Sequence, residues 1–344
     1  MKPLDNIQQV RELTITPENR FFSAQHEEID SGLTTDIYFI KTKEILDKIN
    51  LGDTEVTAEI FTRKEGVLVG VDEVKRLLKN KGVEVWSLKE GDTFSPNETL
   101  MRLKGPYNNF GMYETVFLGM LASSSGWATR AKMAKDAAQG KPVFCFGARH
   151  VHPAVAPVME RSAIIGGADG ASCILGAKLL GKEPGGTVPH AIFLIVGDTV
   201  KVAQSYDELM PSDALRLVLV DTFKDEAEEA LRVAEALGER LDGIRLDTPS
   251  ERGGVTPGLV REIRARLDAG GHSKVQIFVS GGLYPEKMQG LAEAGADAFG
   301  VGSYISAAPP IDMTMDIKEI NGKPIAKRGR IPGIIPNSRL EKLL

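Results

Sequence analysis

The chain has 344 residues, which is enough for two domains, or for one α/β barrel with an appended domain. Apolar residues make up 42% and charged residues 26%, a globular composition that excludes a disordered chain. The net charge of −5 argues against binding along nucleic-acid backbones, and two cysteines exclude a disulfide scaffold. Because no apolar stretch suits a membrane span or a signal peptide, we expect a cytoplasmic protein with no membrane partner.

The N-terminal segment, residues 1–120, predicts a mixed domain of strands and helices. Hydrophobic alternation, turn signals and one amphipathic stretch define its elements in chain order. These are a strand over 54–61, a strand or turn over 65–70, a helix over 71–81, and strands over 86–91 and 99–105. A long helix rich in Ala, Ser and Met is expected over residues 114–136, leading into the second part of the chain.

From residue 142 onward, short runs that are apolar on both faces alternate with helical segments. The runs cover residues 143–146, 217–220, 243–246, 275–279 and 298–302. The helices are expected over residues 226–237, 256–267 and 285–294. Buried parallel strands have this pattern, so residues 121–320 predict a (β/α) barrel or an open doubly wound sheet. We expect the basic, proline-interrupted tail, residues 321–344, to pack on the N-terminal domain or elsewhere on the surface.

Glycine-containing loops follow the last two predicted strands. Gly281 and Gly282 end one strand, and Gly302 with Ser303 ends the next. Glycine lets backbone N–H groups approach an anion closely, and consecutive loops of this kind at late barrel strands form a phosphate site. Tight turns without a ligand are the alternative for either loop alone.

Acidic and basic side chains occupy other strand ends. Asp221 and Asp247 suit Mg²⁺ or ribose hydroxyls, with capping of the following helices as the alternative. Arg149 and Arg245 suit a carboxylate or a diphosphate, although either alone is typical of a structural ion pair. Two arginines beside two aspartates favour an anionic ligand handled together with a metal.

Histidines give a weaker signal. His190 follows a glycine-rich turn and can serve as a nucleophile, as an acid or base, or as a structural residue. His150 and His152 would share one face of a strand, but no third zinc ligand is near them in the sequence. We therefore interpret these two as structural or anion-contacting residues.

Taken together, the motifs resemble the nicotinate phosphoribosyltransferases, within the type II family that also contains the quinolinate and nicotinamide enzymes. The motifs that carry the resemblance are residues 32–38, 146–149, 166–172, 186–190, 219–222 and 245–247, with the two glycine loops. It implies an N-terminal α/β sandwich domain followed by an irregular, incomplete (β/α) barrel. It further implies a homodimer or larger assembly in which one subunit's N-terminal segment completes its neighbour's site.

The resemblance also implies roles for single residues. Tyr38 would line the nicotinate ring, Thr187 would contact nicotinate, and Arg245 would bind its carboxylate. His190 would match the histidine that such enzymes phosphorylate with ATP. The residues implied to hold 5-phosphoribosyl 1-diphosphate with Mg²⁺ are Arg149, Asp221, Asp247, Gly281, Gly282, Gly302 and Ser303.

Some positions depart from the pattern of the family. His150 stands where many relatives carry a second arginine, and Val188-Pro189 stands where others often have Leu-Ala. The Cys-rich zinc-binding extension of some relatives is absent from this sequence, so no zinc is expected.

The resemblance implies an enzyme of NAD biosynthesis and salvage. It would form nicotinate mononucleotide and diphosphate from nicotinate and phosphoribosyl diphosphate, with ligase-type coupling to ATP. The alternatives are a decarboxylating quinolinate phosphoribosyltransferase and a non-catalytic barrel that binds a phosphoribosyl nucleotide.

Overall fold

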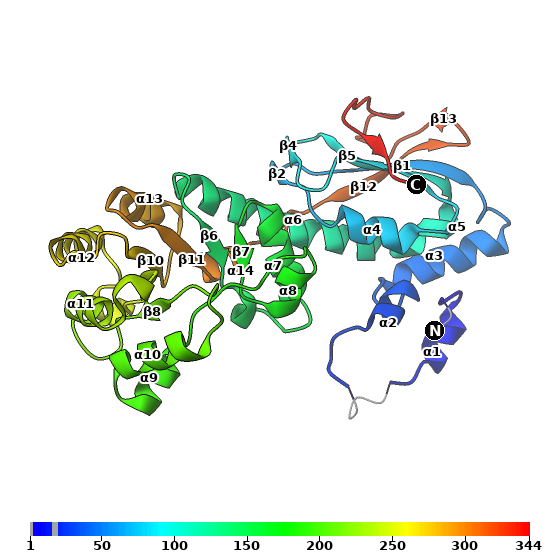
Figure 1. Ribbon diagram of the computed structural model, residues 1–344. Coiled ribbons are helices and arrows are strands. Elements are labelled where there is room, and N and C mark those ends of the chain that lie inside the picture. The colour runs from blue at the N-terminus through cyan, green and yellow to red at the C-terminus, as the bar shows by residue number, and fades with distance from the viewer. Residues whose placement is uncertain (1–2, 16–19) are drawn as a thin grey trace. The chain divides into compact units, whose positions relative to one another are not determined.

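The computed structural model describes residues 3–15 and 20–344 (Figure 1). The chain divides into two compact units, of which the first runs as far as Ala128 and resumes at Pro309–Leu344. The second unit is Thr129–Ala308, and helix α6 (Glu114–Ala137) contains the first boundary between the units. Within the described ranges, none of the helices combines the length and apolar character that crossing a membrane requires.

The first unit is built on a six-stranded antiparallel sheet with the order β13-β12-β1-β5-β3-β14. Its strands are β1 (Glu55–Phe61), β3 (Glu84–Ser87), β5 (Thr99–Pro106), β12 (Thr314–Ile320), β13 (Lys323–Pro324) and β14 (Glu341–Lys342). A separate ribbon pairs β2 (Gly66–Val67) with β4 (Thr93–Phe94). The helices are α1 (Ile7–Glu12), α2 (His26–Asp30), α3 (Ile37–Lys48), α4 (Val71–Leu78), α5 (Tyr107–Phe110) and η2 (Gly111–Tyr113).

The second unit ends earlier than expected, at Ala308 instead of residue 320. Strand β12 pairs along its length with β1, so residues 309–320 belong to the first unit and not to the parallel sheet. Met315 and Ile317 pack against the apolar core of that unit, which explains why this segment joins it. After it, β14 pairs with β3, and Leu343 packs on the same core.

The second unit is a six-stranded parallel sheet with the order β7-β6-β11-β10-β9-β8. Its strands are β6 (Val143–Cys145), β7 (Gly170–Ala171), β8 (Leu217–Leu219), β9 (Gly243–Leu246), β10 (Gln276–Ser280) and β11 (Ala298–Val301). Strands β7 and β8 are the two edges, since no pairing between described residues joins them. The architecture is therefore mixed α/β with a parallel β/α region whose sheet stays open, as expected for an incomplete barrel.

Helices connect these strands and cover the sheet. They are η3 (Ala148–His150), α7 (Ala156–Ile165), α8 (Ile174–Lys178), α9 (His190–Val196), α10 (Thr199–Leu209), α11 (Glu226–Leu237), η4 (Gly238–Arg240), η5 (Ser250–Arg252), α12 (Pro257–Ala269), α13 (Pro285–Glu293) and α14 (Ser303–Ser306). Figure 1 shows α11, α12 and α13 side by side along strands β8 to β11. Asp225 caps α11 and Thr256 caps α12, which confirms the helix starts expected from the sequence.

Candidate active site

The expected site residues of the second unit lie at the carboxyl ends of its parallel strands. Arg149 lies in η3 after β6, Asp221 follows β8, and Asp247 follows β9. Gly281 and Gly282 follow β10, while Gly302 and Ser303 follow β11. Because parallel strands end at one edge of their sheet, these groups meet on one face, where parallel α/β folds bind their ligands.

Arg245 is the centre of this cluster. Its Nε donates to Ser280 Oγ (2.9 Å), its Nη1 to Thr187 Oγ1 (2.9 Å) and its Nη2 to Asp247 Oδ2 (3.1 Å). The guanidinium carbon also lies 5.2 Å from the centre of the Phe146 ring. These contacts use three of the five N–H groups, and among the described residues the other two, one on each terminal nitrogen, have no partner. Arginine N–H groups are well suited to carboxylate oxygens, so these two are available to an anionic ligand.

Burial changes the proton affinity of Arg245. The side chain is 15% exposed, and desolvation lowers the pKa of Arg245, while Asp247 and Asp221 oppose the shift. Repulsion from Arg149 lowers the pKa of Arg245 further. Arg149 follows β6 and Arg245 lies near the end of β9, so both guanidinium groups belong to the carboxyl edge of one sheet.

Asp221 and His190 form a second pair. His190 Nε2 lies 3.0 Å from Asp221 Oδ2, a distance at which the imidazole N–H donates to the carboxylate. The Asp221 side chain is only 2% exposed, and its Oδ1 has no hydrogen-bond partner in the part of the chain that the structure describes. Desolvation raises the pKa of Asp221, and the bond from His190 opposes this shift. An unpaired buried carboxylate oxygen is costly, which points to a ligand at this position.

Arg149 is held beside the loop that follows β11. Its Nε donates to His150 Nε2 (3.2 Å), so the proton of that imidazole is on Nδ1, which lies 3.2 Å from Ser306 Oγ. A Cβ on Gly302 would come within 3.0 Å of Phe146 O and 3.1 Å of the His150 ring. The histidine thus links Arg149 to Ser306, and together with Phe146 O it leaves little room for a side chain at position 302.

Asp221 and Asp247 are the candidate ligands for the Mg²⁺ ion expected from the sequence. No group of three or more His, Cys, Asp or Glu side chains is arranged as metal ligands in residues 3–15 and 20–344. Magnesium, however, is commonly bound through one or two carboxylates plus substrate phosphates. The unpartnered Oδ1 of Asp221 and the carboxylate of Asp247, whose charge raises the pKa of Asp221, are oxygen donors of the kind that such a site would need.

Asp247 lies so close to Gly281 that a side chain at position 281 would clash with it. Gly281 has φ +88°, and a Cβ built on it would lie 2.7 Å from Asp247 Oδ1. We expect Gly281→Ala to lower the free energy of unfolding by about 1–3 kcal/mol through backbone strain, and to displace the carboxylate. Thermal unfolding and the Mg²⁺ dependence of activity measure both effects. Gly271→Ala is the matched control, because Gly271 also has positive φ but an added Cβ there meets open space. An equal loss of unfolding free energy in both variants would contradict the proposed clash between the added Cβ and Asp247.

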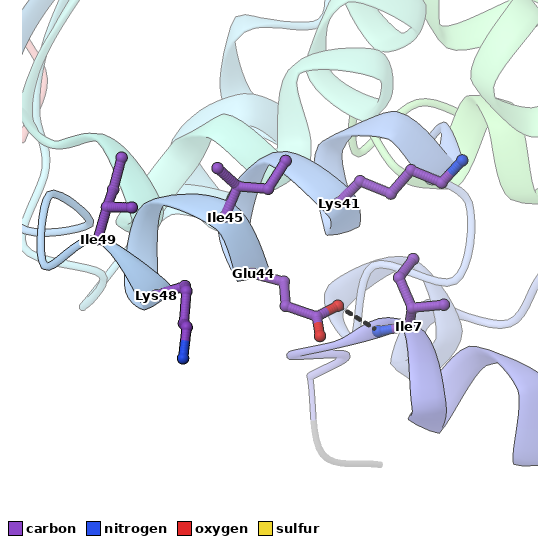
Figure 2. Close-up of a pocket in the computed structure, with 6 residues that line it drawn as sticks. All are labelled: Ile7, Lys41, Glu44, Ile45, Lys48 and Ile49. Atoms are coloured by element: carbon purple, nitrogen blue, oxygen red, sulfur yellow. Dashed lines mark hydrogen bonds between the residues drawn. The ribbon is translucent and has the colours of Figure 1, made fainter.

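Tyr38 belongs to the first unit, whereas the strand-end residues belong to the second. It is on α3, 54% exposed, with its ring centre 4.3 Å from that of Phe39. It lines a cavity of about 270 Å³ in the first unit together with Asp36 and Glu114. Burial, with a smaller contribution from the negative charge of Asp316, raises the pKa of Glu114 to about 7. A second cavity of this unit lies between α1 and α3, where Glu44 accepts the N–H of Ile7 (Figure 2).

Two contributors to the site were not identified from the sequence. Ser280 orients Arg245 and also donates from its hydroxyl to Leu246 O (3.3 Å), while Phe146 stacks on the guanidinium. The available signal is positional, since both residues stand directly at strand ends beside predicted site residues. Ser303 is at the start of α14 with its side chain exposed.

Comparison with protein families gives two adjoining matches. Residues 36–125 match the quinolinate phosphoribosyl transferase N-terminal domain, and residues 127–316 match the C-terminal domain of the same family. Together they cover most of both units.

Individual relatives carry two kinds of name. Nicotinate phosphoribosyltransferase pncB2 of Mycobacterium tuberculosis is 31% identical over 70% of this chain and 52% of its own length. The chain thus spans about half of that relative. A probable nicotinate-nucleotide pyrophosphorylase [carboxylating] of Methanothermobacter thermautotrophicus is 24% identical over 81% of this chain and 93% of its own length.

Solved structures share the fold. A nicotinate-nucleotide pyrophosphorylase from Pyrococcus furiosus is 47% identical, with a TM-score of 0.88 over 92% of this chain and 82% of that one. Human nicotinic acid phosphoribosyltransferase shares the fold at 18% identity, with a TM-score of 0.71 over 88% of this chain and 77% of that one. The chain belongs to the quinolinate phosphoribosyl transferase family, the type II phosphoribosyltransferases.

Proposed function

We propose that this protein transfers the phosphoribosyl group of 5-phosphoribosyl 1-diphosphate to the ring nitrogen of a pyridine carboxylate. The products are nicotinate mononucleotide and diphosphate, in NAD biosynthesis. Family membership supports the transfer reaction. The arrangement of Arg245 is the observation that supports a carboxylate-bearing acceptor. Thr187 and Asp247 hold the guanidinium in place. Its two N–H groups that have no partner among the described residues suit one carboxylate on a flat ring.

In the proposed reaction the pyridine nitrogen attacks the anomeric carbon of the ribose, and the bond from that carbon to diphosphate breaks. Positive charge develops on the ribose ring as the leaving group departs. Asp221 and Asp247 face this charge, and Arg149 faces the departing diphosphate. Catalysis in this scheme comes from positioning and electrostatic stabilisation, without a proton transfer to the reacting atoms.

Binding of the sugar phosphate draws on the two glycine loops. Backbone N–H groups of Gly281–Gly282 and Gly302–Ser303 would hold the 5-phosphate. Asp221 Oδ1 and the Asp247 carboxylate would hold Mg²⁺, which neutralises the diphosphate when bound. A larger assembly with a shared site, to which Tyr38 would contribute, remains part of the proposal.

Quinolinate is the acceptor that the comparisons support better, in contrast to the order expected from the sequence. Both family matches carry its name, and the carboxylating relative aligns over nearly all of its own length. With quinolinate, transfer would be followed by loss of the carboxylate next to the ring nitrogen as CO₂.

Nicotinate is the second candidate, and the site itself favours it. Arg245 and Arg149 stand against Asp221 and Asp247, so the positive charge of the cluster is largely compensated before a ligand binds. A monocarboxylate suits this balance better than a dicarboxylate does. The His190–Asp221 pair also provides the histidine that ATP-coupled transfer to nicotinate would use.

A diphosphate-release assay with phosphoribosyl diphosphate and quinolinate, nicotinate or nicotinamide, with and without ATP, tests the proposal. Release with a pyridine carboxylate but not with nicotinamide supports it. Accompanying CO₂ identifies quinolinate, whereas stimulation by ATP identifies nicotinate. Binding of phosphoribosyl diphosphate with no release for any acceptor would contradict the proposal and leave a non-catalytic sensor.

His190 is expected to act in ATP coupling and not in the transfer step. Where ATP stimulates the wild-type enzyme, His190→Ala should abolish the stimulation while lowering ATP-independent transfer by less than about tenfold. Initial rates with and without ATP measure this. His26→Ala, at an exposed histidine on α2, is the control. Unchanged stimulation in His190→Ala would remove the assignment.

A further inference from the structure

Glu160 is a fully buried carboxylate whose partners belong to two strand-end loops. It lies on α7 with 0% of its surface exposed. Its Oε1 accepts hydrogen bonds from Ala148 N–H (3.0 Å) and Ser172 Oγ (3.1 Å). Its Oε2 accepts a bond from Cys173 N–H (2.5 Å). Both oxygens therefore face donors only.

These donors follow neighbouring parallel strands. Ala148 directly precedes Arg149 in η3 after β6, and Ser172 with Cys173 follows β7. The last residues that pair between the two strands are Cys145 and Ala171. Glu160 therefore connects the two loops by hydrogen bonds just beyond that pair. Ser172 ends the sequence motif over residues 166–172, to which no role in the reaction has been given.

A glutamate is a costly choice for this position. A buried charge requires compensation, and the partners of Glu160 in the structure are neutral donors and not a basic side chain. Glutamine cannot replace it, because the amide NH₂ would face one of the donors wherever the oxygen is placed. The requirement for two acceptor oxygens suits a group that fixes the geometry of both loops.

We propose that Glu160 is a positioning residue that holds the η3 turn, and with it Arg149, in place for the diphosphate of the donor substrate. The inference rests on the proposed function, since it assigns Arg149 to the diphosphate. It predicts that the bonds from Glu160 affect phosphoribosyl diphosphate selectively and leave the binding of the pyridine carboxylate unchanged.

The test compares Glu160→Gln and Ser172→Ala with the wild type and with Glu229→Gln. Glu229 is equally buried in the same unit but bonds to Arg232 on α11, away from both loops. Calorimetric binding of phosphoribosyl diphosphate with Mg²⁺, separate KM values for both substrates, and amide hydrogen exchange over residues 147–150 are measured. Circular dichroism establishes that each variant is folded.

We expect Glu160→Gln to weaken phosphoribosyl diphosphate binding by about tenfold or more, with faster exchange over 147–150 and an unchanged KM for the acceptor. Ser172→Ala, which keeps the carboxylate and should fold even if Glu160→Gln does not, should weaken binding by about two- to tenfold. Glu229→Gln should change neither quantity.

Equal effects on the KM values of both substrates, or binding by Ser172→Ala as tight as in the wild type, would overturn the positioning role. Absence of phosphoribosyl diphosphate binding by the wild type would instead overturn the proposed function. Hydrogen exchange then still decides whether Glu160 holds the turn, because unchanged exchange over 147–150 in a folded Glu160→Gln would contradict it.

Discussion

Arg245→Ala is expected to lower kcat/KM for the pyridine carboxylate by about 10²- to 10³-fold, mainly through a higher KM. Truncation removes the proposed carboxylate site and leaves Asp247 without its buried partner, and losses of this kind cost about 2–5 kcal/mol. Steady-state kinetics with the acceptor varied at saturating phosphoribosyl diphosphate measures the change. The KM for phosphoribosyl diphosphate should change much less.

Two further variants separate this role from general effects. Arg245→Lys keeps the charge but has three N–H donors instead of five, so it cannot bond Thr187, Ser280, Asp247 and both oxygens of a carboxylate together and should also raise the acceptor KM. Arg240→Ala is the control, because Arg240 pairs with Asp207 at an exposed position on η4. An unchanged acceptor KM in Arg245→Ala would remove Arg245 from the carboxylate site.

Asp221→Asn is expected to lower kcat by about 10³-fold with little change in fold. The substitution keeps the shape but removes the charge that would face Mg²⁺ and the developing positive charge of the ribose, a change typically worth about 3–4 kcal/mol. Kinetics at several Mg²⁺ concentrations measures it, and the variant should also require more Mg²⁺. Asp225→Asn is the matched control, since Asp225 caps α11 and asparagine caps a helix equally well.

The pH dependence of activity gives a second readout of Asp221. Burial raises the pKa of Asp221 above its ordinary range, so the carboxylate becomes protonated at a higher pH than usual as the pH falls. Activity should therefore fall on the acid side in the wild type, and Asp221→Asn should lack that part of the profile. Full activity of Asp221→Asn, or the same acid limb in both proteins, would contradict the role.

The strands of the second unit were predictable wherever a run was apolar on both faces. Residues 217–220, 243–246 and 298–302 each contain an observed strand, β8, β9 and β11, because buried parallel strands leave this pattern in any sequence. Strand β7 has only two residues, Gly170–Ala171, which is too short for any periodicity. Strand β12 was missed because its pairing with β1 depends on residues more than 200 positions earlier.

The site was predictable in its residue types but not in its contacts. Asp247, Arg245 and the glycine loops were identifiable because each stands at the end of an apolar run. The partners of Arg245 were not, since Thr187 is 58 positions away and Ser280 is 35 positions away. For Asp221 the sequence left a helix cap open as the alternative, and the structure gives that cap to Asp225.

A crystal structure of the protein with phosphoribosyl diphosphate, Mg²⁺ and nicotinate tests the central claim most directly. We expect the 5-phosphate at the amides of Gly281–Gly282 and Gly302–Ser303, and the carboxylate of the ring at the two unpartnered N–H groups of Arg245. Ligands bound away from the carboxyl ends of strands β8 to β11, or an Arg245 that contacts neither ligand, would contradict the account.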